Sequence, residues 1–323
     1  MSDKESPQTV STRAGFAAVI GAPNAGKSTL VNALVGEKVS IVTHKVQTTR
    51  FAVRGVALEG PVQIVLVDTP GVFAPKRRFD KAMVHAAWAG TEGADSVVHV
   101  VDASARDRLE QGRAKGADRK TVEDDDKVIE GLKAAGVKAI LALNKIDLMA
   151  NERLLAMTAE LFETGAYEEV FMISAKGGGG VKQLKARLAE LMPESPWLYP
   201  EDQVADLPSR LLAAEITREK LYLRLHEELP YASMVETEAW KPLKDGSLRI
   251  EQTVIVERDS QKPIVLGKGG RAIKDIGAAA RQELEETLGR KVHLFLNVKV
   301  DARWTEQRAR YSEIGLEFDP DKK

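Results

Sequence analysis

The 323-residue chain contains no cysteine and only five histidines. The absence of cysteine excludes disulfides, thiolate metal sites and cysteine nucleophiles, and it fits a reducing compartment. The histidines are scattered, with no pair at the spacing of zinc ligands on a helix, so zinc hydrolase chemistry is not expected. No apolar run approaches the roughly 18 residues that span a bilayer, and residues 1–12 lack the apolar segment of a secretory signal. We therefore expect a cytoplasmic protein.

The chain also lacks a charge excess of either sign. Its 47 basic and 48 acidic residues give a formal net charge of -1. A protein that coats a polyanion by general electrostatic attraction is usually basic. Any contact with nucleic acid must therefore come from a local basic patch.

Hydrophobic patterning divides the chain into two domains of different class. Between residues 14 and 190, short apolar runs alternate with helix-period stretches, which predicts an α/β domain with a mostly parallel sheet and helices on both faces. The expected strands are 16–20, 62–67, 96–101, 139–143 and 170–173, and the expected helices include 128–135, 154–162 and 181–191. The densely charged stretch 106–126 is typical of a solvated surface insertion.

Four prolines between residues 193 and 208 predict a linker, after which the pattern changes. A helix (211–229), two strands (232–240 and 248–257), a helix (273–288) and a last strand (292–300) indicate an α+β domain whose sheet is covered on one face. The expected parts are a tail (1–13), the first domain (14–190), the linker (191–208), the second domain (209–310) and a C-terminal tail (311–323).

A phosphate-binding loop follows the first expected strand, at the segment that runs from Gly21 to Thr29. Its backbone N–H groups can wrap phosphates, Lys27 can supply charge to the β and γ phosphates, and the Ser28 hydroxyl can ligate Mg²⁺. We expect every residue of the loop to contact nucleotide, namely Gly21, Ala22, Pro23, Asn24, Ala25, Gly26, Lys27, Ser28 and Thr29.

Three further segments at strand ends complete a guanine nucleotide site. In Asp68-Thr69-Pro70-Gly71, the carboxylate can hold Mg²⁺ through water and the Gly71 N–H can meet the γ phosphate. In Asn144-Lys145-Ile146-Asp147, the Asp147 carboxylate can accept from guanine N1–H and the 2-amino group, which adenine lacks, and this argues against an ATPase. In Ser174-Ala175-Lys176, a backbone N–H can meet the guanine O6.

A second glycine loop, Gly267-Lys268-Gly269-Gly270, lies between two expected helices and predicts a KH-type clamp for single-stranded nucleic acid. Between residues 258 and 274, five basic residues face a single acid, Asp259, so this segment has a net charge of +4. The expected RNA contacts are Arg258, Lys262, Gly267, Lys268, Gly269, Gly270, Arg271 and Lys274. The similar Gly177–Gly180 run is expected only to shape the loop that meets the guanine base.

With both sets of motifs, the chain resembles the Era family, bacterial GTPases of the translation-factor class that join a P-loop GTPase domain to a C-terminal type II KH domain. The resemblance covers about residues 14–310 and includes three further segments, which are 47–50 (Gln-Thr-Thr-Arg), 215–220 and 228–231. It implies that residues 47–50 are the first switch, with Thr48 or Thr49 on Mg²⁺, and that Asn24 helps to hold K⁺. The catalytic set that it implies is Lys27, Thr48, Thr49, Asp68 and Gly71, and the metal ligands are Ser28, Thr48, Thr49 and Asp68.

The resemblance also implies a function: GTP hydrolysis coupled to binding of the 3′ end of 16S ribosomal RNA during maturation of the 30S subunit, by a monomer. Val72 stands where Ras-like GTPases have the glutamine that orients water, so we expect slow intrinsic hydrolysis. The alternative is a membrane-associated signalling or cell-cycle GTPase, peripheral on the inner membrane, whose basic segment meets acidic lipids. Acidic residues interrupt the candidate basic helix around 218–224, which disfavours this alternative.

Overall fold

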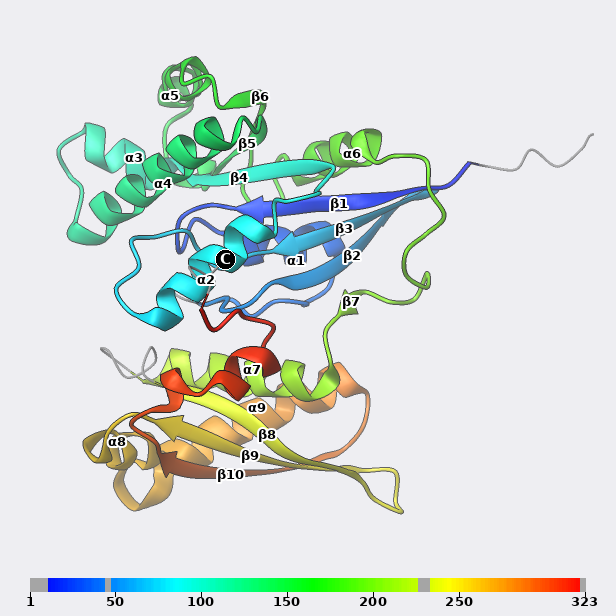
Figure 1. The fold of residues 1–323 in the computed structure, drawn as a ribbon, viewed down its shortest axis with the longest axis vertical. Coiled ribbons are helices and arrows are strands. Elements are labelled where there is room, and N and C mark those ends of the chain that lie inside the picture. Colours follow the sequence, from blue (N-terminus) through cyan, green and yellow to red (C-terminus); the bar gives the residue numbers. More distant parts are fainter. Residues whose placement is uncertain (1–10, 44–47, 226–232, 320–323) are drawn as a thin grey trace, which may run out of the picture. The chain divides into compact units, whose positions relative to one another are not determined.

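A computed structural model describes residues 11–43, 48–225 and 233–319 (Figure 1). These residues form two compact units. The first unit comprises residues 11–40, 52–73 and 87–206, and the second comprises 41–43, 48–51, 74–86, 207–225 and 233–319. Two segments that carried the family resemblance, Gln47 and residues 228–231, lie outside the described residues.

The first unit is built on a seven-stranded sheet of order β6-β5-β4-β1-β3-β2-β7. Its strands are β1 (Arg13–Ile20), β2 (Val53–Glu59), β3 (Val62–Asp68), β4 (Ser96–Asp102), β5 (Ala139–Asn144), β6 (Tyr167–Met172) and β7 (Ala205–Asp206). All neighbours are parallel except β2, which runs antiparallel to both β3 and β7. Every residue of β3, β4 and β5 is buried, which is why these strands have continuous apolar sequences. The predicted strands are present, whereas β2 and β7 were not predicted.

Helices cover both faces of this sheet, as predicted. They are α1 (Lys27–Val35), α3 (Ala103–Glu110), α4 (Gly116–Ala135), α5 (Asn151–Glu163) and α6 (Val181–Leu191), with a 3₁₀ turn, η1 (Ile146–Leu148). Helix α2 (Arg78–Ala89) belongs to the second unit up to residue 86 and to the first unit from residue 87. One core cluster joins the sheet to α1 and α6, for example through Leu34 and Leu184. Another joins it to α4 and α5 through residues such as Leu132 and Leu161. The doubly covered α/β fold is therefore confirmed.

Most of the stretch 106–126 is solvent-accessible, as expected, but it is a helical part of the fold and it buries some of its acids. This stretch forms α3 and most of α4, and Asp124 and Asp125 are only 1% and 0% exposed. Asp124 accepts from Lys120 Nζ at 2.8 Å and from Lys127 Nζ at 2.9 Å. Burial is tolerated because the acids have partners within the fold, which a count of charges along the sequence does not reveal.

The second unit contains a three-stranded sheet of order β10-β9-β8, with β8 antiparallel and β10 parallel to β9. Its principal elements are α7 (Ser209–Arg224), β8 (Ser233–Pro242), β9 (Leu248–Val256), α8 (Lys262–Leu266), α9 (Arg271–Leu288), β10 (Val292–Val300) and α10 (Arg308–Glu313). The 3₁₀ turns are η2 (Asp259–Gln261), η3 (Lys268–Gly270) and η4 (Trp304–Glu306). Leu221, Val254 and Ile276 join α7, β9 and α9 in one core. The predicted type II KH order is therefore confirmed.

The C-terminal region differs from the expected tail that starts at residue 311. The chain continues as α10, and Tyr311 and Leu316 are 1% and 5% exposed. The ring of Phe79, which belongs to the same unit, packs edge-on against both Trp304 and Tyr311 at centroid distances of 5.4 Å. The C-terminal segment is therefore stabilised by packing against Phe79, a residue that is distant in the sequence. Within the described part of the chain, no helix is long and apolar enough to cross a membrane.

Candidate nucleotide and RNA sites

The phosphate-binding loop connects β1 to α1, as its sequence predicts. Gly26 precedes α1 with φ of 107°, and a Cβ there would lie 2.2 Å from Asn144 Nδ2. Only glycine therefore fits both the backbone conformation and the close approach of the guanine loop, the segment 144–147 that is expected to contact the base. The ammonium of Lys27 donates to the carbonyls of Gly21 at 3.1 Å and Ala22 at 2.9 Å, so this side chain folds over its own loop.

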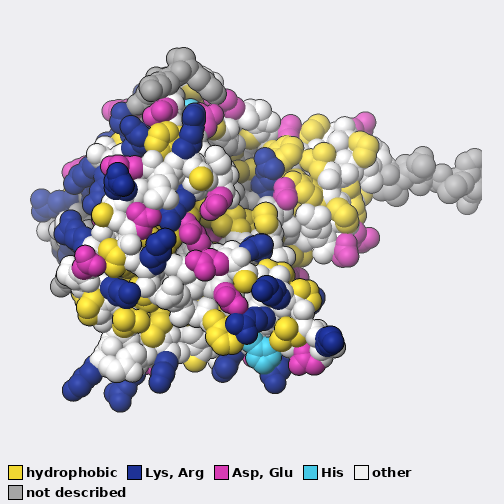
Figure 2. Space-filling model, turned by 60° about the horizontal axis from the view of Figure 1, so that its bottom comes forward, with side chains coloured by type: hydrophobic (Ala, Val, Ile, Leu, Met, Phe, Trp, Pro, Cys, Tyr) yellow, Lys and Arg dark blue, Asp and Glu magenta, His cyan; other side chains and the backbone are white. Residues whose placement is uncertain are grey.

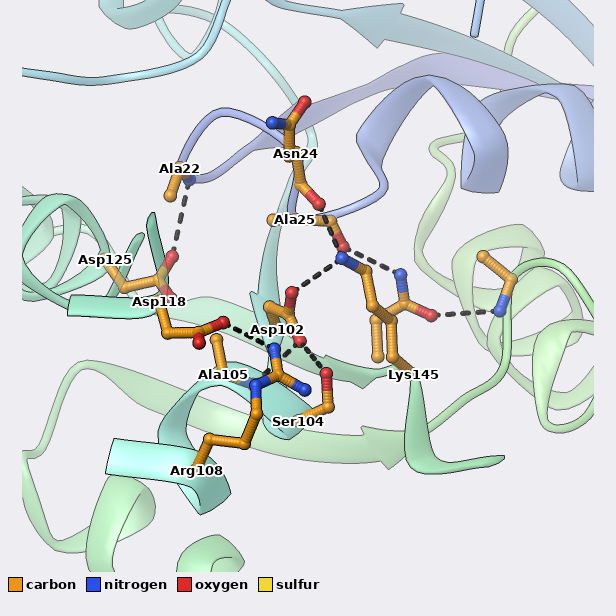
Figure 3. A network of polar contacts seen from close by, with 12 residues as sticks. Ala22, Asn24, Ala25, Asp102, Ser104, Ala105, Arg108, Asp118, Asp125 and Lys145 are labelled. Atoms are coloured by element: carbon orange, nitrogen blue, oxygen red, sulfur yellow. Dashed lines mark hydrogen bonds and ion pairs between the residues drawn. The ribbon is translucent and has the colours of Figure 1, made fainter. Parts of the chain in front are cut away.

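The guanine loop is joined directly to the phosphate loop (Figure 3). Asn144 Nδ2 donates to the Ala25 carbonyl at 2.8 Å, while Asn144 Oδ1 accepts from the Ala175 N–H at 2.9 Å. Lys145 Nζ donates to the Asn24 carbonyl at 2.8 Å. Three predicted segments thus meet at one edge of the sheet. Asp147, on η1, is exposed and free to meet a base.

The segment that begins at Asp68 also reaches the phosphate loop. Asp68 ends β3 and is fully buried. Thr69 Oγ1 donates to the Val19 carbonyl at 2.8 Å, and the Val72 N–H donates to the Gly21 carbonyl at 3.1 Å. These bonds fix Pro70 and Gly71 beside the loop that is expected to carry the phosphates.

The charge balance around Lys27 suits a bound anion. Burial lowers the pKa of Lys27 to about 8, and the carboxylates of Asp68 and Asp125 oppose this shift. A phosphate would favour the ammonium form further. The Ser28 hydroxyl and the Asp68 carboxylate, the predicted metal ligands of this unit, are hard oxygen donors of the kind that Mg²⁺ prefers. In the described part of the chain, no group of three or more His, Asp or Glu side chains could hold a metal by itself.

The KH glycine loop is tightly turned and basic. Gly267 has φ of 71°, its N–H donates to the Pro263 carbonyl at 2.8 Å, and a Cβ would lie 2.6 Å from Ala272 Cβ. Side chains of the predicted basic contacts are all exposed, namely Arg258, Lys262, Lys268, Arg271 and Lys274. On the face drawn in Figure 2, Lys and Arg side chains are interspersed with acidic ones, in keeping with the near-zero total charge.

Two family models match this chain: residues 16–145 match one described as 50S ribosome-binding GTPase, and residues 228–305 match a KH domain. The chain is 73% identical to GTPase Era of Maricaulis maris over 95% of its length and 98% of that protein. It is 63% identical to GTPase Era of Caulobacter vibrioides over 96% and 98%. The chain belongs to the Era family. It is therefore a GTPase with a KH domain.

Solved structures of Era support the same assignment. Era in complex with MgGDPNP and nucleotides 1506–1542 of 16S ribosomal RNA is 36% identical, with a TM-score of 0.84 over 94% of this chain and 99% of that chain. A point variant of Aquifex aeolicus Era bound to GDP and AlF₄⁻ has a TM-score of 0.82 at the same identity and coverage. The family thus uses GTP or GDP with Mg²⁺.

The described residues of the predicted first switch lie in the second unit of this Era-family chain. Thr48 and Thr49 belong to a segment that packs on α7, where Val42 N–H donates to Glu219 Oε1 at 2.8 Å and Arg218 donates to the Thr48 carbonyl. The structure therefore brings the described residues of this segment together with the KH fold. The choice between Thr48 and Thr49 as a metal ligand stays a prediction.

Among the described residues of this segment, Arg50 is the most enclosed, at 3% exposure. Its guanidinium donates to the Ser233 carbonyl at 2.7 Å and to the Tyr222 hydroxyl at 3.0 Å. It also lies 5.7–5.9 Å from the ring centres of Phe79, Tyr222 and Trp304. Cation–π attraction and hydrogen bonds thus compensate for its burial. Sequence reasoning missed these partners, because none is near Arg50 along the chain.

Proposed function

We propose that this GTPase binds the 3′ end of 16S ribosomal RNA through its KH domain and that GTP controls this binding during maturation of the 30S subunit. The observation that carries the proposal is which segments make up the second unit. It contains both the KH fold and the described part of the first switch. Era with a bound 16S ribosomal RNA fragment supports the choice of partner. Because that RNA belongs to ribosomes, we place the protein in the cytoplasm.

Nucleotide binding follows from the geometry of the first unit. The backbone around Gly21 to Gly26 and the Lys27 ammonium receive the phosphates, and Asp147 selects guanine at the other end of the site. Asn144 keeps these two ends in register through its bonds to Ala25 and Ala175. Thr29, Thr69, Pro70, Ser174 and Lys176 complete the proposed contact set.

Magnesium would be held by Ser28, by Asp68 through water and by Thr48 or Thr49, and when bound it neutralises phosphate charge. No glutamine follows Gly71. Val72 is 4% exposed, and its N–H is used by Gly21. The chain therefore offers no side chain at this position to orient water, which supports slow intrinsic hydrolysis.

RNA binding is proposed for the loop between α8 and α9. The glycines allow a nucleic-acid backbone to approach closely, and the Lys268 and Arg271 side chains can meet its phosphates. GTP would order the first switch and residues 68–88. The contacts of Val42 and Thr48 with α7 would then couple the ordering of the first switch to the KH fold.

The test is to measure the affinity of a fluorescent single-stranded RNA with the 16S 3′ sequence in the presence of a non-hydrolysable GTP analogue and of GDP. We expect tighter binding with the GTP analogue. Equal affinities in the two states would disprove nucleotide control. Gly269→Asp introduces a carboxylate into the loop at a residue with φ of 62°, so it should abolish RNA binding in both states.

The same variant separates RNA from the membrane alternative. If the wild-type protein binds vesicles with acidic lipids, Gly269→Asp should leave that binding unaffected. Retention of RNA binding by a folded Gly269→Asp protein would show that RNA uses another surface. Nucleotide affinity serves as the control, because the KH loop and the phosphate loop belong to different units.

A further inference from the structure

Asp102, the last residue of β4, uses both of its carboxylate oxygens (Figure 3). Oδ1 accepts from the Ser104 hydroxyl at 2.7 Å and from the Ala105 N–H at 3.1 Å, which makes Asp102 the N-cap of α3. Oδ2 accepts from Lys145 Nζ at 2.6 Å. The side chain is only 8% exposed. The cap therefore fixes the carboxylate in one orientation, with its second oxygen directed at Lys145.

Lys145 is the residue that this carboxylate holds in place. Its ammonium is shared between Asp102 and the Asn24 carbonyl, 2.8 Å away, so it ties the guanine loop to the phosphate loop. Its backbone is left-handed, with φ of 65°, an uncommon conformation for a residue with a long side chain. Two residues later the chain reaches Asp147 on η1. A fixed Lys145 therefore restricts the position of Asp147.

We propose that Asp102 is a positioning residue for guanine recognition and nucleotide retention. It holds Lys145 by a charge-assisted hydrogen bond and through it sets the position of Asp147. The inference rests on the assignment of Asp147 to the guanine base. It gives α3 a function as well, because the helix N-terminus stabilises the charge that faces Lys145.

Asp102→Asn is the informative substitution. Asparagine is a good N-cap and can still accept from Ala105 and Ser104, but its amide nitrogen cannot accept from Lys145. We expect GDP to dissociate about tenfold faster, whereas kcat at saturating GTP should change by less than about twofold. The affinity ratio between GDP and inosine diphosphate should shrink. Inosine lacks the 2-amino group, so a displaced Asp147 penalises GDP more than its analogue.

Asp118→Asn provides a matched control. Asp118 accepts from Arg108 at 2.6 Å and from the Lys115 N–H at 2.9 Å, so its loss loosens the α3–α4 pair without touching Lys145. We expect wild-type dissociation of GDP from this variant. Equal weakening of GDP and inosine diphosphate by Asp102→Asn, or no weakening, would overturn the positioning role. If wild-type protein bound GDP no better than ADP, the proposed guanine site itself would fail.

Discussion

At the scale of single residues, Lys27 is buried in a way that lowers its pKa before phosphate binds. The side chain is 6% exposed and donates to two carbonyls of its own loop. Burial lowers its pKa to about 8, in spite of the attraction of Asp68 and Asp125. The free enzyme therefore carries a partly neutral lysine in mildly alkaline solution. Phosphates would restore its full charge.

Nucleotide binding should consequently take up a proton at alkaline pH. With a pKa of about 8 for Lys27, GDP binding at pH 8.5 should take up about three-quarters of a proton, against about a tenth at pH 7. Calorimetry in buffers with different ionisation enthalpies measures this uptake. Absence of any increase between the two pH values would show that Lys27 is fully charged before the nucleotide arrives.

At the scale of elements, β4, β6 and α4 share a buried polar cluster. His99 of β4 is fully buried, with Nδ1 2.8 Å from the Tyr167 hydroxyl and Nε2 3.6 Å from Asp125 Oδ1. Burial lowers the pKa of His99, and the nearby Asp125 carboxylate only partly opposes this shift, while Arg106 and Lys27 lower the pKa further. His99 is therefore held as a neutral side chain in the core of the first unit.

Acid should loosen this part of the sheet selectively. Below the unfolded pKa of about 6.5, the unfolded chain binds a proton that buried His99 does not. The stabilisation is therefore complete above that pH and is lost as the pH falls. Hydrogen exchange of β4 amides should show an opening free energy lower by up to about 1 kcal/mol near pH 5.5 than near pH 7. His99→Gln should flatten this response, and β9 amides serve as the control. A parallel response of β4 and β9 would contradict it.

Elements specified by local patterns were predictable, and those specified by distant partners were not. The phosphate loop, the guanine loop and the KH glycine loop are contiguous motifs at the ends of apolar runs. The antiparallel strand β2 and the short β7 were missed, because Arg54 and Gly55 interrupt β2 and prolines surround β7. The burial of Asp125 was missed, because this residue meets His99 only in the folded sheet.

At the scale of the whole molecule, the division into units does not follow the order of motifs along the chain. Residues 41–43, 48–51 and 74–86 are flanked by parts of the nucleotide-binding unit, yet all of them group with the KH fold. Arg50 from one segment and Phe79 from the other meet Trp304 near the C-terminus. Any rearrangement of these segments on nucleotide binding would therefore disturb contacts within the RNA-binding unit. This arrangement can supply the coupling free energy that allostery requires.

Arg50→Lys tests this coupling. A lysine ammonium keeps the charge but cannot reproduce the forked bonds of the guanidinium to Ser233 and Tyr222. We expect GDP affinity to be retained, while the ratio of RNA affinities in the GTP-analogue and GDP states falls about fivefold. Arg54→Lys is the control, because that arginine is exposed and pairs with Asp206 in the first unit. An unchanged ratio in folded Arg50→Lys protein would mean that nucleotide state reaches the KH fold without Arg50.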